Sequence, residues 1–167
     1  MHPFSFLVAR RAFLIFLSLV AFSACKPRLI PDSSVPDTRQ NRAVMAFLDD
    51  YRKAMESKSV EAVMSLVAED FYDRAAITAP PFAIDRTQLE SKLQQTFDKV
   101  ENFAVRFYVQ HIEKRGNQLD VVYYFVQRAL VKYPTNSDWI TGNDVNRLVL
   151  RMKGSSTKDG FEIVSGL

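Results

Sequence analysis

The fold of this chain is decided by residues 44–73, which read VMAFLDDYRKAMESKSVEAVMSLVAEDFYD. Apolar side chains recur there at intervals of three and four residues, which places them on one face of an α-helix. The first such face, in a helix expected to begin near Asn41, consists of Val44, Phe47, Leu48, Tyr51 and Met55. Ser59 is suited to cap a second, shorter helix, whose apolar face consists of Val60, Val63, Met64 and Val67. The stretch therefore predicts two consecutive helices that each turn one face toward a core.

One more helix and then a sheet are expected after residue 73. Asp85 and Gln88 stand in the order of a capping box, ahead of a helical apolar pattern that ends near Glu101. From there the apolar period changes from about 3.6 to 2, which is typical of strands. The expected strands are residues 103–111, 119–132, 145–153 and 161–165, with turns at 116–117 and 154–160 and a loop at 133–143. The second strand is apolar on both faces, so it needs cover on both sides.

Three helices followed by four antiparallel strands favour an α+β cone, in which a curved sheet wraps the long helix. The sequence of residues 44–73 and the ending DGFEIVSGL at 159–167 resemble the nuclear transport factor 2-like (cystatin-like) superfamily. Ketosteroid isomerase, scytalone dehydratase and polyketide cyclases share the fold of this superfamily. The resemblance covers most of the chain and rests on structural motifs. It implies a pocket between the helices and the concave sheet face, and pairing of two copies through their sheets. Because one fold hosts many functions, it implies no particular reaction.

The first residues predict export and lipid attachment. Arg10 and Arg11 precede an apolar run, and small residues follow it, which is the order of a secretory signal peptide. The run is shorter than the roughly 20 residues that a spanning helix needs. Its end, Phe22-Ser23-Ala24-Cys25, resembles a bacterial lipobox, so we expect cleavage between Ala24 and Cys25 and a lipid on the Cys25 sulfur. The alternatives are an ordinary cleaved leader and a permanent spanning helix.

The expected organisation is a signal peptide at residues 1–24, a lipidated cysteine and Pro-rich tether at 25–40, and one domain at 41–167. Prolines in the tether favour an extended, solvated backbone that would hold the domain a few nanometres from the lipid, at roughly 3 Å per residue. We expect a bacterial cell-envelope location, facing the periplasm. Lys26 is not the aspartate of an inner-membrane retention signal, which favours the outer membrane. General secretion and twin-arginine export both remain open.

Composition excludes several classes of function. The leader contains two of the 22 basic residues and none of the 19 acidic ones, so the chain that remains after cleavage has a net charge of +1. It therefore lacks the excess of basic residues that is typical of nucleic-acid-binding proteins. Cys25 is the only cysteine, and His2 and His111 are the only histidines. An intramolecular disulfide, a thiolate nucleophile and a multi-histidine zinc site are therefore excluded within one mature chain. We expect no metal and no cofactor.

An isomerase-like reaction needs a carboxylate base and a neutral acid inside an apolar pocket. Glu113 shares the expected phase of His111 but lies next to a turn, and Asp120 has the opposite phase from Tyr123, so no catalytic residue is assigned. The pocket candidates are His111, Tyr123, Gln127, Asn146 and Trp139. For each strand residue the alternative is a structural role, and for Trp139 it is a plug at the open end of the cone. The candidates for a dimer face are Tyr108, Val122, Tyr124, Val126 and Val149, unless a loop or the tether covers them.

These observations favour a lipid-anchored envelope protein that is dimeric and acts as a ligand-binding, protein-binding or assembly module. Its expected partners are the membrane through the lipid, a second copy, and an envelope protein or an apolar small molecule, but not nucleic acid. The alternative is a small-molecule isomerase or dehydratase that uses the cone pocket.

Overall fold

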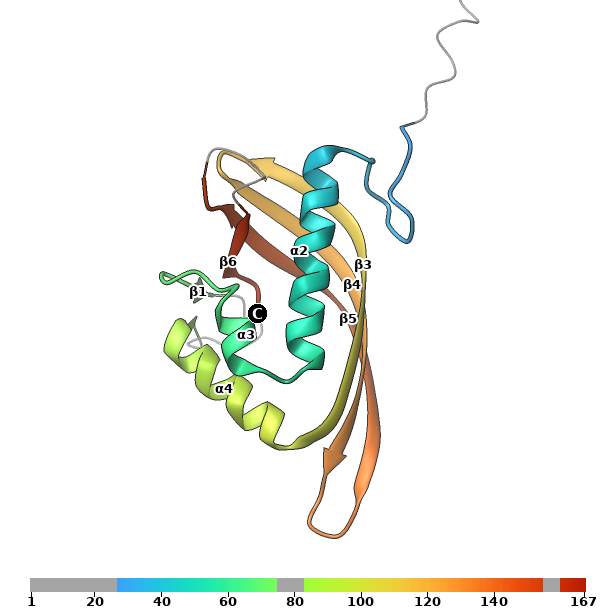
Figure 1. Cartoon of the computed structure of the whole chain (residues 1–167), viewed down its shortest axis with the longest axis vertical. Coiled ribbons are helices and arrows are strands. Elements are labelled where there is room, and N and C mark those ends of the chain that lie inside the picture. The colour runs from blue at the N-terminus through green and yellow to red at the C-terminus, as the bar shows by residue number, and fades with distance from the viewer. Residues whose placement is uncertain (1–26, 75–82, 155–159) are drawn as a thin grey trace, which may run out of the picture.

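The computed structural model describes residues 27–74, 83–154 and 160–167. Its helices are α2 (Arg39–Glu56), α3 (Val60–Met64) and α4 (Arg86–Asp98). Its strands are β1 (Tyr72–Asp73), β2 (Ile84–Asp85), β3 (Val100–Arg115), β4 (Gln118–Lys132), β5 (Ser137–Met152) and β6 (Phe161–Ser165). Strands β3 to β6 form an antiparallel meander, whereas β1 and β2 pair separately. The large sheet curves around α2, and α3 and α4 lie on the same side of it (Figure 1).

The helices begin where the sequence places their caps. Thr38 accepts a hydrogen bond from the Asn41 amide at the start of α2, and Ser59 accepts one from the Ala62 amide at the start of α3. Asp85 and Gln88 form both bonds of a capping box before α4. The helix pair and the third helix are thus confirmed, although α4 ends at Asp98 and not near Glu101. The second helix is shorter than expected: α3 ends at Met64, and Val67 lies beyond it in a bridge to Ile163. No helix within the described ranges is long and apolar enough to cross a bilayer.

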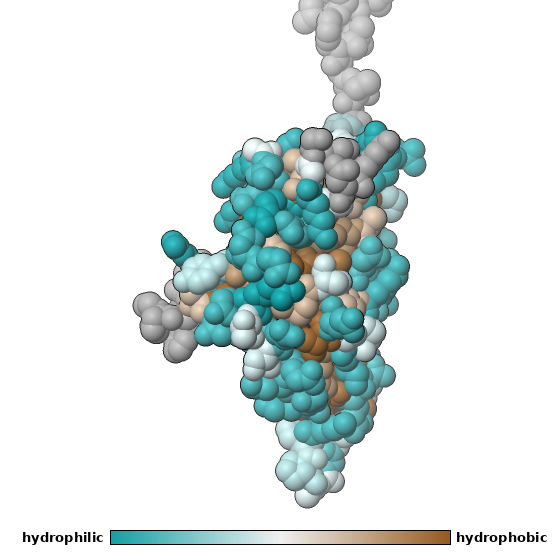
Figure 2. Space-filling model, turned by 60° about the vertical axis from the view of Figure 1, so that its left-hand side comes forward, coloured by the Kyte–Doolittle hydropathy of each residue, from teal (hydrophilic) through white to brown (hydrophobic). Residues whose placement is uncertain are grey.

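The core lies between the helices and the inner face of the sheet. Phe47 of α2 meets Phe161 of β6 edge to face, with ring centroids 5.9 Å apart. The fully buried side chains of the core include Val44, Val63, Val109, Leu119, Val121, Leu148, Leu150 and Ile163. Polar residues cover most of the face in Figure 2, where hydrophobic side chains surface in a recessed strip toward the narrow end. The alternation expected for β4 is confirmed, with its Leu119 face buried against the helices.

A β-bulge changes the phase of the first long strand. The register of β3 and β4 shifts between Val109 and His111, so that His111 lies opposite Val122 and Ile112 lies opposite Val121. Val121 is fully buried and Ile112 packs on the core. His111 is therefore exposed on the outer face of the sheet. The expectation that His111 shares a face with Val109 is wrong, because an extra residue in one strand reverses the alternation beyond it.

The fifth strand begins earlier than the sequence suggests. Residues 137–143, expected in a loop, belong to β5 and pair with the end of β4, from Lys132 opposite Ser137 onward. This pairing occupies backbone groups that would otherwise lie unpaired along the end of β4. Trp139 consequently lies in a strand. The β4–β5 hairpin extends past the helices at the lower end of the molecule, and we call residues 133–140 the hairpin tip (Figure 1).

The Pro-rich segment also differs from the expected extended tether. Its described part folds back on itself, with the Ile30 amide donating to the Val35 carbonyl at 3.0 Å. The Ser34 amide then donates to the Val109 carbonyl on β3 at 2.9 Å. Val35 is only 2% exposed and belongs to the core. The prolines prevent a helix but permit this turn, and burial of the apolar Ile30 and Val35 side chains favours its docking on the domain.

Candidate functional site

A small cavity of about 100 Å³ lies inside the cone, between α2 and the inner face of the sheet. Tyr51 and Met55 reach it from α2, where a spacing of four residues places them on one face. The sheet contributes alternate residues of its strands, which share a face. The complete lining is Tyr51, Met55, Phe103, Val105, Phe107, Tyr123, Phe125, Gln127 and Asn146.

Aromatic rings form the walls of this cavity. The Tyr51 ring stacks on the Phe107 ring, with centroids 5.6 Å apart and planes 5° from parallel. Phe107 in turn meets Tyr123 edge to face, with centroids 5.0 Å apart. Interlocking rings of this kind hold one another in place. The cavity therefore has a rigid, apolar wall.

Two tyrosine hydroxyls and the side-chain amides of Gln127 and Asn146 supply the polar groups. Asn146 donates to the Tyr123 hydroxyl at 3.3 Å and to the Gly166 carbonyl at 3.0 Å. Burial raises the pKa of Tyr123 to about 12, against the lowering effect of the Asn146 hydrogen bond, and burial raises the pKa of Tyr51 as well. Both hydroxyls are thus neutral near pH 7. Of the described residues that line the cavity, none is an aspartate, a glutamate or a histidine.

The structure brings together three of the five expected pocket residues, namely Tyr123, Gln127 and Asn146. His111 lies on the opposite face of the sheet because of the bulge. Trp139 lies in the hairpin tip and is 47% exposed, with the Arg128 guanidinium 4.9 Å from its ring centroid. Sequence reasoning did not assign the remaining lining residues to the pocket. The sequence patterns that could have identified them are the helical spacing of apolar residues for Tyr51 and Met55, and the strand period of two for the phenylalanines.

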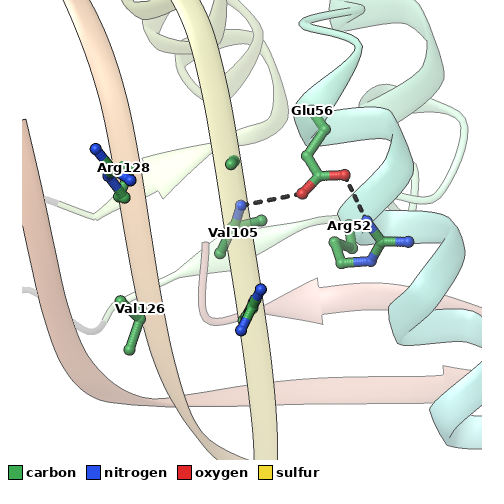
Figure 3. Close-up of a pocket in the computed structure, with 7 residues that line it drawn as sticks. Arg52, Glu56, Val105, Val126 and Arg128 are labelled. Atoms are coloured by element: carbon green, nitrogen blue, oxygen red, sulfur yellow. Dashed lines mark hydrogen bonds and ion pairs between the residues drawn. The ribbon is translucent and has the colours of Figure 1, made fainter. Parts of the chain in front are cut away.

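A larger hollow of about 760 Å³ lies at the β3 edge of the sheet (Figure 3). Its lining residues are Arg52, Glu56, Ala104, Val105, Arg106, Val126 and Arg128. Glu56 accepts a hydrogen bond from the Val105 amide at 3.1 Å and also pairs with Arg52. This carboxylate is therefore already engaged. Within the described part of the chain, Arg106 and Arg128 have no carboxylate within 4.0 Å, so this hollow suits an anion better than a cation.

The outer face of the sheet carries all five residues expected on a dimer face. Tyr108 lies opposite Tyr124, and Val122, Tyr124 and Val126 alternate along β4, with Val149 opposite Asp120. Val145, opposite Tyr124, extends the same patch and was not named from the sequence. Tyr108 is 42% exposed and Val145 is 51% exposed. The docked N-terminal segment reaches this face at its edge, where the Ser34 Oγ atom lies 3.5 Å from the Tyr108 hydroxyl.

No family model and no curated protein matches this sequence. Solved structures do resemble it. A nuclear transport factor 2-like superfamily protein from Salmonella enterica superposes with a TM-score of 0.62, at 10% identity, over 76% of this chain and 87% of that one.

This chain has the nuclear transport factor 2-like fold. A proposed dehydratase of the nuclear transport factor 2-like family from Streptomyces avermitilis gives a TM-score of 0.58 at 16% identity, over 76% of this chain and 93% of that one. A proposed scytalone dehydratase from Novosphingobium aromaticivorans gives 0.60 at 13% identity, over 76% and 80%. Such low identities show the fold alone, and the fold expected from the sequence is confirmed.

Proposed function

We propose that this chain is a lipid-anchored protein of the bacterial cell envelope, and that its nuclear transport factor 2-like domain is a binding and assembly module. Two copies pair through the outer faces of their sheets. The observation that carries this proposal is the exposed apolar patch around Tyr108, Tyr124 and Val145 on the outer face. Apolar patches on an otherwise polar surface mark sites of protein contact.

The inner cavity favours binding or assembly over the alternative of an isomerase or dehydratase. Its volume of about 100 Å³ is below the roughly 300 Å³ at which pockets for drug-sized ligands begin. Its two tyrosine hydroxyls would supply the neutral acid of such a reaction. An isomerase also needs a base, and the described lining residues contain no carboxylate.

The outer face suits pairing with an identical copy. A two-fold axis places the same surface on both partners, so the patch of one copy faces the patch of the other. The face belongs to a paired sheet and carries β-branched and aromatic side chains, which pack well against a second sheet. Charged side chains lie within and beside the patch, since Arg147 is opposite Val122 and Arg106 is opposite Val126. Asp120 is held by Arg115 at 3.1 Å and by Arg147 at 2.8 Å, so this carboxylate is paired within the chain.

The lipid anchor rests on the leader and on Cys25, both of which lie outside the described residues. The Phe22-Ser23-Ala24-Cys25 motif supports acylation of Cys25 after cleavage behind Ala24. Lys26, which is not the aspartate of an inner-membrane retention signal, favours an outer-membrane position facing the periplasm.

Sedimentation velocity tests the pairing. A protein comprising residues 26–167 retains every described residue, and we expect a dimer at micromolar concentration. Val145→Asp places a charge beside Tyr124 in the patch and should give a folded monomer. Thr135→Asp, an exposed change in the hairpin tip, is the matched control and should stay dimeric. A monomeric unaltered protein would contradict the proposal, and a small molecule that co-purifies in the inner cavity would favour the isomerase or dehydratase instead.

A further inference from the structure

The segment between Cys25 and α2 is part of the domain and not a free linker. Leu29 bridges to Pro36, and the Asp37 amide donates to the Arg28 carbonyl at 2.6 Å, which closes the turn. The Ser34 amide bonds to the Val109 carbonyl on β3. The Asn41 side chain donates to the Pro36 carbonyl at 2.8 Å, which ties the turn to α2.

Burial reinforces these hydrogen bonds. Val35 is 2% exposed and Ser33 is 7% exposed. The Ser33 hydroxyl donates to the Ile30 carbonyl at 2.9 Å, so this buried polar group is satisfied. Arg42 of α2 also pairs with Asp37 at 3.2 Å. The chain is therefore fixed to the domain from about Arg28 onward.

Docking shortens the reach of any anchor at Cys25. Four residue steps separate Cys25 from Leu29, and a fully extended chain spans at most about 14 Å over that length. An undocked segment that extended from Cys25 to Gln40 would span up to about 50 Å. The domain must consequently lie close to whatever holds Cys25.

We propose that docking of residues 27–38 on β3 seats the lipidated domain on the bilayer surface, with the start of α2 toward the lipid headgroups and the hairpin tip away from them. This inference rests on the proposed lipidation of Cys25. Its partner is a phospholipid surface. Two arginines lie near the anchor, and both pair with the one carboxylate of Asp37, at 3.9 Å from Arg28 and 3.2 Å from Arg42. Arg28 is 87% exposed and Arg42 is 64% exposed, so the pair keeps a net positive charge that suits phosphate headgroups.

The shape of the molecule fixes what points away from the membrane. The described N-terminal residues and the start of α2 lie at one end of the long axis, and the hairpin tip lies at the other (Figure 1). The 18 residues of α2 alone span about 27 Å, and the hairpin extends beyond them. Tyr133, Trp139 and Ile140, each nearly half exposed, are thus presented to the aqueous compartment.

Fluorescence quenching in vesicles tests this orientation. Because the lone cysteine carries the lipid, an engineered cysteine is the only free thiol and can take a fluorophore. The positions are Arg39→Cys, exposed at the start of α2, and Thr135→Cys, exposed in the hairpin tip. The lipidated protein is reconstituted in phosphatidylethanolamine and phosphatidylglycerol vesicles with spin-labelled headgroups. We expect several-fold stronger quenching at position 39 than at position 135.

A linker insertion is the matched control. About ten Gly and Ser residues between positions 26 and 27 leave the docked turn intact and add roughly 17 Å of flexible reach. Quenching at position 39 should then fall toward that at position 135. Equal quenching at the two positions in vesicle-bound protein without the insertion overturns the orientation alone. Failure of the protein to float with the vesicles overturns the lipid anchor, and with it the orientation, so the two failures are distinguishable.

Discussion

The Ser34 amide donates a hydrogen bond of 2.9 Å to the carbonyl of Val109, and this bond joins the Pro-rich segment to the edge of the sheet. Val109 is also the last residue of β3 before the bulge. The docked segment and the change of phase therefore meet at one place. There the neighbouring Val35 side chain enters the core beside α2.

Val35→Ala should destabilise the protein by about 1–3 kcal/mol, because it removes two buried methyl groups and leaves a cavity. Urea unfolding measures the loss. Leu29→Ala is the matched control, since Leu29 lies in the same segment but is 49% exposed, and its cost should stay within about 0.5 kcal/mol. Equal, negligible costs at both positions would show that the segment is a free tether.

Tyr123 should make the protein lose stability at alkaline pH. Its folded-state pKa of about 12 lies above the ordinary value of 10.0, because burial disfavours the phenolate. The unfolded state therefore releases this proton first, and the stabilisation is present below pH 10 and lost as pH rises toward 12. In Tyr123→Phe, the fall in melting temperature over that interval should be shallower by the equivalent of about 2 kcal/mol.

The slope with pH is the readout for this change, since the loss of the Asn146 hydrogen bond shifts stability at every pH. Tyr133→Phe is the control, because Tyr133 is 46% exposed in the hairpin tip. Its alkaline slope should match that of the unaltered protein. An unaltered slope in Tyr123→Phe would contradict the burial of this hydroxyl.

Trp139 should behave as a water-exposed, cation-flanked indole. It is the only tryptophan, it is 47% exposed, and Arg128 stacks on its ring. We expect red-shifted emission that iodide quenches more strongly than caesium does, because the guanidinium attracts the anion. Arg128→Gln should remove the preference for iodide, and Arg52→Gln, whose guanidinium is paired with Asp49, should preserve it. Blue-shifted emission without quenching would contradict this exposure and would support the alternative that Trp139 plugs the open end of the cone.

The helices could be predicted from the sequence because their signals are local. Ser59 and the Asp85 and Gln88 pair cap helices through bonds to residues three positions away. The inner-face residues Tyr123 and Asn146 were also predictable, because β4 and β5 pair without a bulge, so that successive side chains point to opposite faces along both strands. These features need no knowledge of distant contacts.

Three of the differences depend on a contact with another strand or segment. The bulge before His111 follows from the register between β3 and β4, which no single strand encodes. Trp139 joins a strand because Leu130 lies opposite it. The segment around Val35 docks because the Val109 carbonyl at the sheet edge accepts a hydrogen bond from the Ser34 amide. In each case a tertiary contact overrides the local preference.

Gly166→Ala should destabilise the protein more than Gly116→Ala. Both residues have positive φ, 98° and 64°, so both changes strain the backbone, by about 1–2 kcal/mol at an open site. A Cβ at Gly166 would also lie 2.0 Å from the Arg147 carbonyl oxygen, whereas one at Gly116 would meet nothing within 4 Å. We therefore expect at least about 1 kcal/mol more loss at Gly166 in urea unfolding, where overpacking adds to strain. Equal losses would mean that the chain end moves freely aside.

Cys25→Ser should release the protein from the membrane. An acyl chain contributes about 0.8 kcal/mol per buried methylene, and serine offers no sulfur for the lipid. The variant should therefore occur either as a soluble periplasmic protein or as an uncleaved precursor, which cell fractionation and intact mass distinguish. Thr135→Ser, an exposed change in the hairpin tip, should fractionate as the unaltered protein does. Normal cleavage of Cys25→Ser together with unchanged membrane association would show that something other than the Cys25 lipid holds the domain there.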